Sequence, residues 1–248
     1  MSEHVEFQPS FLLHQRCVGE KDALCTFFTR EYGRLNVWVK GKYSEQGQIP
    51  LFKPLLISWR ASETSLQLTH IEINRQHPLI CHSSIVSDFL YSAFYVNELN
   101  YKLLPEFAAS EELYSHYVWL LESMAQKLYI EPILRAYELQ LLVETGNISD
   151  IFSDVLTGAP LNSGHFYRCI NHSELGFGLT QVDQRFTEKN RTQCFLGEHL
   201  LKFEANCLDT EVSLSDIKRL MRILIHSTLK GETLKSRTLF TSFKKKGC

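Results

Sequence analysis

The sequence predicts an α+β protein, with a small N-terminal β-barrel followed by a mainly α-helical bundle domain that carries a loop-rich insert. Short segments alternate between apolar and polar residues up to residue 73, as half-buried strands do. After His77-Pro78, apolar residues recur at a helical period of about 3.6. The 248 residues are enough for one large or two small domains. We therefore expect a β domain over residues 1–79 and a helical domain over residues 80–248.

The β domain contains strand-like segments of apolar and β-branched residues at 11–14, 23–28, 32–43, 55–59 and 65–73. Loops that contain glycine or proline separate them, and the loop 42–50 is polar and longer than a tight turn. Five short strands of this kind fit a small closed barrel, and the OB-fold is the commonest barrel of five strands. We therefore predict an OB-fold over residues 1–79.

The third of these segments carries side chains suited to a single nucleic-acid strand. Its alternation puts Leu35, Val37 and Val39 on one face, where they can enter a core. The other face carries Arg34, Asn36, Trp38 and Lys40, with Lys42 just past Gly41. An indole between cations can stack on a base while the cations meet phosphates. The alternative is an edge strand with a solvated polar face and a tryptophan packed against a loop.

Helical periodicity after residue 80 predicts helices over residues 85–103, 110–128, 131–144 and 213–229. Ser110 begins the second helix, and Pro132 falls in the first turn of the third, where proline is tolerated. The short connections between the first three are typical of a bundle. A last helix or turn over residues 234–243 precedes a basic tail.

Residues 147–190 are predicted to form an irregular insert, with a short helix over residues 148–156. Within it, His165, Cys169 and His172 are spaced i, i+4 and i+7, so they could share one face of a helix. Zinc accepts both residue types, but a structural zinc site takes four ligands and no convincing fourth is nearby. The seven cysteines of the chain include no Cys-x-x-Cys pair. We therefore predict no metal and no cofactor.

The composition is ordinary for a soluble globular protein, with 44% hydrophobic and 22% charged residues. No apolar run is long enough to span a bilayer, and the N-terminus lacks the basic region of a signal peptide. We therefore expect a cytoplasmic protein that does not enter a membrane. The chain holds no glycine-rich phosphate loop, no Gly-x-Ser-x-Gly motif and no His-Glu-x-x-His motif. We therefore predict no catalytic activity.

Positive charge gathers toward the C-terminal end. Residues 80–190 hold six Lys and Arg against fourteen Asp and Glu, whereas residues 191–248 hold eleven against six. Cations of the third and late helices could form a groove beside apolar residues, suited to phosphates or to an acidic peptide tail. The candidates are Arg135, Leu139, Lys218, Arg219, Met221 and Arg222. The ordinary alternatives are a solvated face and a structural pair of Arg135 with Glu131 or Glu138.

Six segments, in the right order over nearly the whole chain, resemble the RecO family of bacterial recombination mediators. The segments of the β domain are Phe11-Leu12-Leu13-His14, Phe28-Thr29-Arg30-Glu31-Tyr32-Gly33-Arg34 and Val39-Lys40-Gly41-Lys42. The segments of the helical domain are Tyr95-Val96-Asn97-Glu98-Leu99, Arg135-Ala136-Tyr137-Glu138-Leu139-Gln140-Leu141-Leu142 and Leu234-Lys235-Ser236-Arg237-Thr238-Leu239-Phe240.

The resemblance implies an OB-fold on a helical domain with a zinc-ribbon-like insert. Many members hold zinc through four cysteines there, and this chain keeps only Cys169. The resemblance also implies binding to single- and double-stranded DNA, annealing of complementary strands, and a nucleoid-associated location. It implies RecR and the acidic C-terminal tail of the single-stranded-DNA-binding protein as partners, and loading of RecA without covalent chemistry.

On this interpretation the DNA contacts come from the barrel residues Arg30, Arg34, Trp38, Lys40 and Lys42. The tail of the single-stranded-DNA-binding protein would occupy the groove formed by the third and late helices. Two other functions fit the same patterns. One is an OB-fold RNA-binding adaptor, because base stacking does not separate RNA from DNA. The other is a hydrolase whose site assembles from scattered residues.

Overall fold

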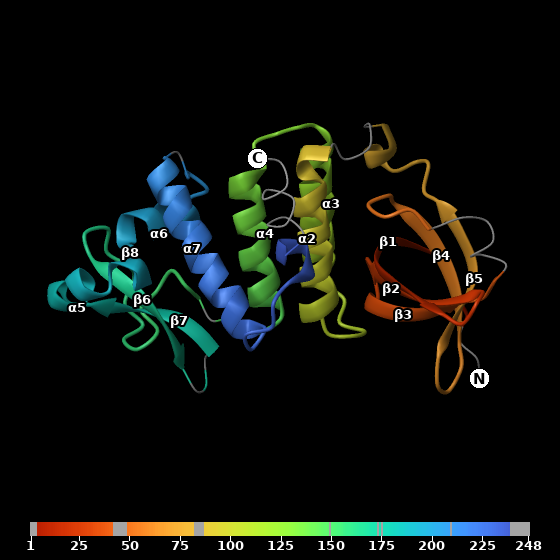
Figure 1. The fold of residues 1–248 in the computed structure, drawn as a ribbon, viewed down its shortest axis with the longest axis horizontal. Helices are drawn as coiled ribbons and strands as arrows, with labels where there is room; N and C mark the ends of the chain where they lie inside the picture. The colour runs from red at the N-terminus through yellow and green to blue at the C-terminus, as the bar shows by residue number, and fades with distance from the viewer. Residues whose placement is uncertain are drawn as a thin grey trace. The chain divides into compact units, whose positions relative to one another are not determined.

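The structure is a computed structural model that describes residues 4–41, 49–81, 87–148, 150–172, 174, 176–208 and 210–238. The chain divides into two compact units, Met1–Leu128 with Thr233–Cys248, and Tyr129–Glu232. The predicted fold class is confirmed, because a closed five-stranded barrel precedes a mainly helical region (Figure 1). The domain boundary expected after residue 79 stays a prediction. In the part of the chain that the structure describes, no helix is both long and apolar enough to cross a membrane.

The barrel closes in the strand order β1-β2-β3-β5-β4. All neighbouring strands are antiparallel except β3 and β5, which make a short parallel contact. The strands are β1 (His4–Val18), β2 (Asp22–Thr29), β3 (Gly33–Val39), β4 (Leu55–Ala61) and β5 (Leu66–Ile73).

Strand β3 shows the predicted alternation. Leu35, Val37 and Val39 are buried in the barrel core, and the residues between them are only half buried. Phe27 and Ile57 from neighbouring strands fill the same core. Because side chains alternate with period two, burial of this apolar face fixes the other face of β3 outward.

Strand β1 is long enough to pair with two neighbours. It pairs with β4 over residues 4–10 and with β2 over residues 10–18. Register shifts interrupt both ladders, and Phe7 has a φ of 48°. Such bulges bend a strand, which lets β1 close the barrel. Beyond Ser10, the β4 side of β1 has no strand partner among the described residues.

The helical elements of the first unit are η1 (Pro78–Cys81), α2 (Ser87–Leu103) and α3 (Glu111–Ala125). Phe11 and Phe28 lie outside the barrel core and yet are buried, at 0% and 1% exposure. Their rings contact Tyr114 and Tyr117 of α3 at centroid distances between 5.2 and 5.8 Å. The Asn97 side chain of α2 donates a 3.1 Å hydrogen bond to a carbonyl of β1. The barrel is therefore docked on these helices.

The connection between α2 and α3, residues 104–110, contacts the start of β3. Arg34 Nε donates to the Leu104 carbonyl oxygen at 2.7 Å. Gly33 has a φ of 68°, and a Cβ atom there would lie 2.1 Å from the Ala108 carbonyl oxygen. Only glycine satisfies both the backbone angle and the close approach.

Residues 235–238 form a helical turn in the first unit. Glu98 of α2 accepts hydrogen bonds from the backbone nitrogens of Lys235 and Ser236, at 2.8 and 2.9 Å, and from Ser236 Oγ at 2.7 Å. The first N–H groups of a helical turn have no partner within it, so the carboxylate satisfies them. The predicted closing segment therefore begins as a turn held on α2, and its residues 239–243 lie outside the described residues.

The second unit combines helices with a small sheet of strand order β7-β6-β8. Its elements are α4 (Ile130–Glu144), β6 (Phe166–His172), β7 (Gly176–Val182), α5 (Gln184–Lys189), η2 (Arg191–Gln193), β8 (Cys194–Leu196), α6 (Gly197–Glu204) and α7 (Glu211–Thr228). Helices α4 and α7, which correspond to the predicted third and late helices, pack against each other.

The insert is more regular than its sequence suggests. The helix predicted over residues 148–156 is wrong, because its described residues, 148 and 150–156, form bends, turns and isolated bridges to other segments. Strands β6 and β7 pair antiparallel as the two arms of a β-hairpin, in place of the expected irregular loop. The apolar residues of β6 stand next to one another, and β7 contains two glycines, so neither strand shows a clear alternation in the sequence.

Asp154 joins two parts of this insert. The side chain is 5% exposed, and its two oxygens accept hydrogen bonds from the backbone of Leu156, Thr157 and Gln181 and from Thr180 Oγ1, at 2.7–3.1 Å. Burial raises the pKa of Asp154, but these hydrogen bonds outweigh it and hold the pKa below its usual value. Asp154 therefore links the loop before the hairpin to β7 as a carboxylate.

We predict that Asp154→Asn lowers the free energy of unfolding by about 2 kcal/mol, because an amide nitrogen cannot accept hydrogen bonds from the donors that it would face. Urea unfolding at neutral pH measures this loss. Since the folded pKa is lowered, the wild-type advantage exists above the unfolded pKa of about 4 and disappears as the pH falls through the folded value. Asp150→Asn is the control, because its one backbone contact is exposed. Equal stability of the two variants would contradict this role.

Candidate nucleic-acid interface and partner pocket

Two of the predicted DNA-contacting residues are engaged within the protein. Arg30 is exposed and forms an ion pair with Glu111, which raises the pKa of its guanidinium. Arg34 is half buried, donates to the Leu104 carbonyl oxygen, and has Nη2 3.5 Å from Glu106 Oε1. Both arginines therefore join the barrel to the helical elements that cover it.

The other predicted contacts lie toward the end of β3. Trp38 is half exposed and Lys40 is exposed, and both follow the part of β3 that the α2–α3 connection covers. Lys42 lies outside the described residues. Trp38 and Lys40 therefore share the outward side of β3 beyond the residues that contact the α2–α3 connection, apart from Arg30 and Arg34.

Trp38 lies in the middle of a strip across the outer face of the barrel. The register places Leu24 of β2 and Gln67 of β5 on either side of Trp38. One strand further out, Arg16 pairs with Leu24 and Arg60 pairs with Gln67. Arg16, Gln67 and Arg60 are exposed, and Leu24 is half exposed like Trp38. We call these five residues the Trp38 strip.

The Trp38 strip has the chemistry needed to hold a single nucleic-acid strand. In the closed barrel, Arg16 on β1 and Arg60 on β4 each lie two strands from Trp38, so they follow the curve of the wall away from the face that carries the indole. A base can stack on the indole beside Lys40, and the two guanidinium groups can meet phosphates of a strand that continues round the barrel. Leu24 and Gln67 supply contact area between the ring and the cations.

Arg16 and Arg60 were not among the residues predicted from the sequence. They lie 22 residues on either side of Trp38 in the chain and become its neighbours only through strand pairing. Their one sequence signal is an exposed cation near the end of each predicted strand, which is common in any barrel. The alternation within one strand shows which face a residue occupies, but it does not show which residues of other strands lie beside it.

Arg135, the central residue of the predicted partner pocket, is 5% exposed. Its Nη1 atom lies 2.8 Å from Glu138 Oε2, and Glu138 is fully buried. The structure therefore contains the structural pair that was the alternative for Arg135. Leu139, one turn further along α4, is half buried.

The remaining pocket candidates lie on α7. Met221 is buried and Arg222 is exposed, whereas Lys218 Nζ lies 3.0 Å from Glu131 Oε1 of α4. Helix α7 therefore carries one exposed arginine, Arg222, and one half-exposed lysine, Lys218, which reaches α4. The apolar Met221 between them is buried.

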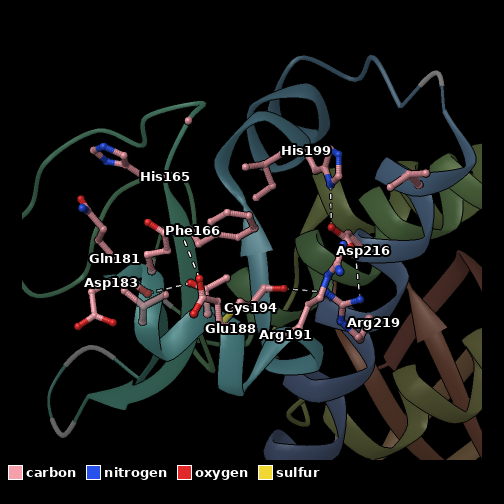
Figure 2. A pocket seen from close by; sticks show the side chains of 16 residues that line it. His165, Phe166, Gln181, Asp183, Glu188, Arg191, Cys194, His199, Asp216 and Arg219 are labelled. Carbon is pink, nitrogen blue, oxygen red and sulfur yellow. Dashed lines mark hydrogen bonds and ion pairs between the residues drawn. The ribbon is translucent and has the colours of Figure 1, made fainter.

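Arg219 faces a cavity of about 860 Å3 in the second unit (Figure 2). Its Nη1 atom lies 2.9 Å from Asp216, its guanidinium lies 4.8 Å from the Phe195 ring centroid, and Nη2 donates to the Cys194 carbonyl oxygen. Asp216 is also 2.7 Å from His199 Nδ1. Figure 2 shows His199, Asp216 and Arg219 directed toward one another, so these charges form an internal network.

The prediction that His165, Cys169 and His172 could share one face of a helix is wrong, because residues 166–172 form strand β6. Three residues apart on a strand, Cys169 and His172 point to opposite faces. Burial raises the pKa of Cys169 to about 11, so its thiol is protonated at neutral pH. Across the described ranges, no group of three or more His, Cys, Asp or Glu could hold a metal ion.

Comparison with known proteins shows the same family over both units. A family model described as "Recombination protein O C terminal" matches residues 88–238. The chain is 30% identical over 241 residues to the DNA repair protein RecO of Cellvibrio japonicus, with 96% of this chain and 97% of that protein covered.

Relatives from other bacteria give the same result. The DNA repair protein RecO of Haemophilus influenzae (strain 86-028NP) is 33% identical over 240 residues, with 95% of this chain and 96% of that protein covered. For Vibrio cholerae (strain M66-2) the identity is 30% over 237 residues, covering 94% and 92%. The chain therefore belongs to the RecO family of DNA repair and recombination proteins.

Proposed function

We propose that this protein is a recombination mediator that works by binding DNA, without covalent chemistry. It binds single- and double-stranded DNA, anneals complementary strands, and with RecR helps to load RecA on DNA coated by the single-stranded-DNA-binding protein. Members of the RecO family are recombination mediators and are generally non-enzymatic. The family membership supports the mediator role, and the barrel surface supports the binding role.

The Trp38 strip is the observation that carries this proposal. It places a half-buried indole beside the exposed Gln67 and Lys40, with one exposed arginine two strands away in each direction round an OB-like barrel. Strands and loops of such barrels bind oligonucleotides. Stacking on one ring tolerates any base, which suits a protein that must act on DNA of any sequence.

The second part of the proposal is a site for the acidic C-terminal tail of the single-stranded-DNA-binding protein. A tail that ends in carboxylates and apolar side chains needs cations beside an apolar surface, and arginine can take a carboxylate through two hydrogen bonds. Arg222 is exposed one turn from half-exposed Lys218, beside buried Met221. We place the tail against these α7 residues, near Leu139. Arg135 and Arg219 support the site through their internal partners.

We predict that Trp38→Ala weakens binding of a fluorescent single-stranded DNA by about tenfold, since stacking on an aromatic ring is worth about 1–3 kcal/mol per base. The slope of log K against log salt should hardly change, because no phosphate contact is lost. Arg60→Ala should lower that slope by about 0.7, the value for one phosphate contact on a single strand. Anisotropy titrations at several salt concentrations give both quantities.

Trp119→Ala is the matched control, because Trp119 is an exposed tryptophan on α3, outside the strip. It should bind like the wild type. If a folded Trp38→Ala variant also binds like the wild type, the indole has no role in DNA binding. An RNA of the same length serves as competitor, and stronger competition by RNA than by DNA would favour the adaptor function instead.

We predict that Arg222→Ala and Lys218→Ala each weaken binding of an acidic tail peptide by about three- to tenfold, since each removes a charge-assisted contact. Binding of bare DNA should be unchanged. Arg185→Ala, at an exposed position of α5, is the control. If both α7 variants bind the peptide normally, or lose peptide and DNA together, the separate tail site is wrong.

Arg135→Ala tests a different property. It leaves the buried Glu138 carboxylate without the charge of its arginine partner, and such a loss costs about 3–5 kcal/mol of folding stability. Weaker peptide binding by this variant could therefore result from partial unfolding as well as from the loss of a contact with the peptide. Denaturation of each variant alongside the titrations separates the two effects.

A further inference from the structure

A second cavity, of about 760 Å3, lies in the first unit between β1, helix α2 and the closing turn. Its walls are mainly apolar, with Leu51 and Phe94 among the residues that line it. Phe94 is 38% exposed, and its ring packs edge-on against Phe52 at 5.2 Å. No residue of the tail site or of the Trp38 strip lines this cavity. This groove is therefore a separate surface, which neither function uses.

The floor of the groove is an open strand edge. Beyond Ser10, strand β1 continues to Val18 while its pairing with β4 has ended. In the described part of the chain, residues 49–51 run along the same groove without joining the sheet. Near the start of this edge, the Asn97 side chain donates a hydrogen bond to the Leu12 carbonyl oxygen. The following residues of β1 present backbone N–H and C=O groups toward a groove rather than toward another strand.

Cations surround this edge. Lys102 and Lys235 line the groove, and His14 lies beside them on β1. Burial lowers the pKa of His14, and the charges of Lys235 and Arg16 lower it further, so His14 adds no positive charge to the groove at neutral pH. The one acidic lining residue, Glu98, has both oxygens engaged by the closing turn. The groove therefore favours a negatively charged occupant.

We propose that an extended acidic and apolar segment of a partner protein binds here by adding a strand to the free edge of β1. The backbone of such a segment pairs with the edge, alternate apolar side chains enter the groove beside Phe94 and Leu51, and the acidic side chains meet Lys102 and Lys235. A nucleic-acid strand fits less well, because the open edge offers backbone N–H and C=O groups at the spacing of a peptide strand.

The test uses the full chain and a short fluorescent peptide that alternates glutamate with valine. A counterpart with methylated backbone nitrogens keeps the side chains and cannot pair, so it should bind at least tenfold more weakly. Cys17 provides a footprint, because it is exposed and lines the groove. The peptide should slow alkylation of Cys17 severalfold and leave the exposed Cys207 of the second unit unchanged.

Lys235→Glu should weaken peptide binding by about tenfold through like-charge repulsion, whereas Lys189→Glu, on exposed α5, should not. Equal binding of the methylated peptide, no saturable binding, or protection of Cys207 as strong as that of Cys17 would overturn the proposal. So would a single-stranded oligonucleotide that protects Cys17 better than the peptide does. Trp38→Ala should bind the peptide normally, so failure of this proposal and failure of the DNA-binding proposal are distinguishable.

Discussion

The contact between the start of β3 and the α2–α3 connection is the constraint on which the first unit depends. Gly33 allows the backbone of residues 104–110 to approach within a distance that any side chain would block. The backbone then forms reciprocal links, since Phe107 N donates to the Arg34 carbonyl oxygen at 3.1 Å while Arg34 Nε donates to the Leu104 carbonyl oxygen. These links hold the connection between α2 and α3 against the start of β3 on the barrel surface.

This constraint divides β3 into a structural half and an accessible half. The outward positions Arg34 and Asn36 are used to hold the connection, the latter through Glu106. The next outward position, Trp38, lies beyond it with Leu24 and Gln67 as neighbours. The aromatic contacts of Phe11 and Phe28 with α3 bury a second part of the barrel. The Trp38 strip is thus a surface that the docked helices leave uncovered.

The sequence predicted what depends on local periodicity and missed what depends on pairing. Alternation placed Leu35, Val37 and Val39 inward and Trp38 outward correctly. It could not show that Arg34 meets a carbonyl 70 residues later, or that Arg16 and Arg60 flank Trp38, because both depend on tertiary register. In the insert, a helical interpretation of His165, Cys169 and His172 failed, because β6 carries its apolar residues as adjacent pairs that do not alternate.

Photo-crosslinking tests most directly whether the Trp38 strip is the DNA-binding surface. Single-stranded DNA carrying 5-iodouracil crosslinks to aromatic side chains that stack on its bases, and mass spectrometry identifies the linked peptides. Exposed aromatic residues elsewhere, such as Trp119 and Tyr129, compete in the same experiment. We expect the crosslinks to concentrate on the peptide that contains Trp38. Crosslinks confined to residues 129–232, or found mainly at Trp119, would contradict this assignment.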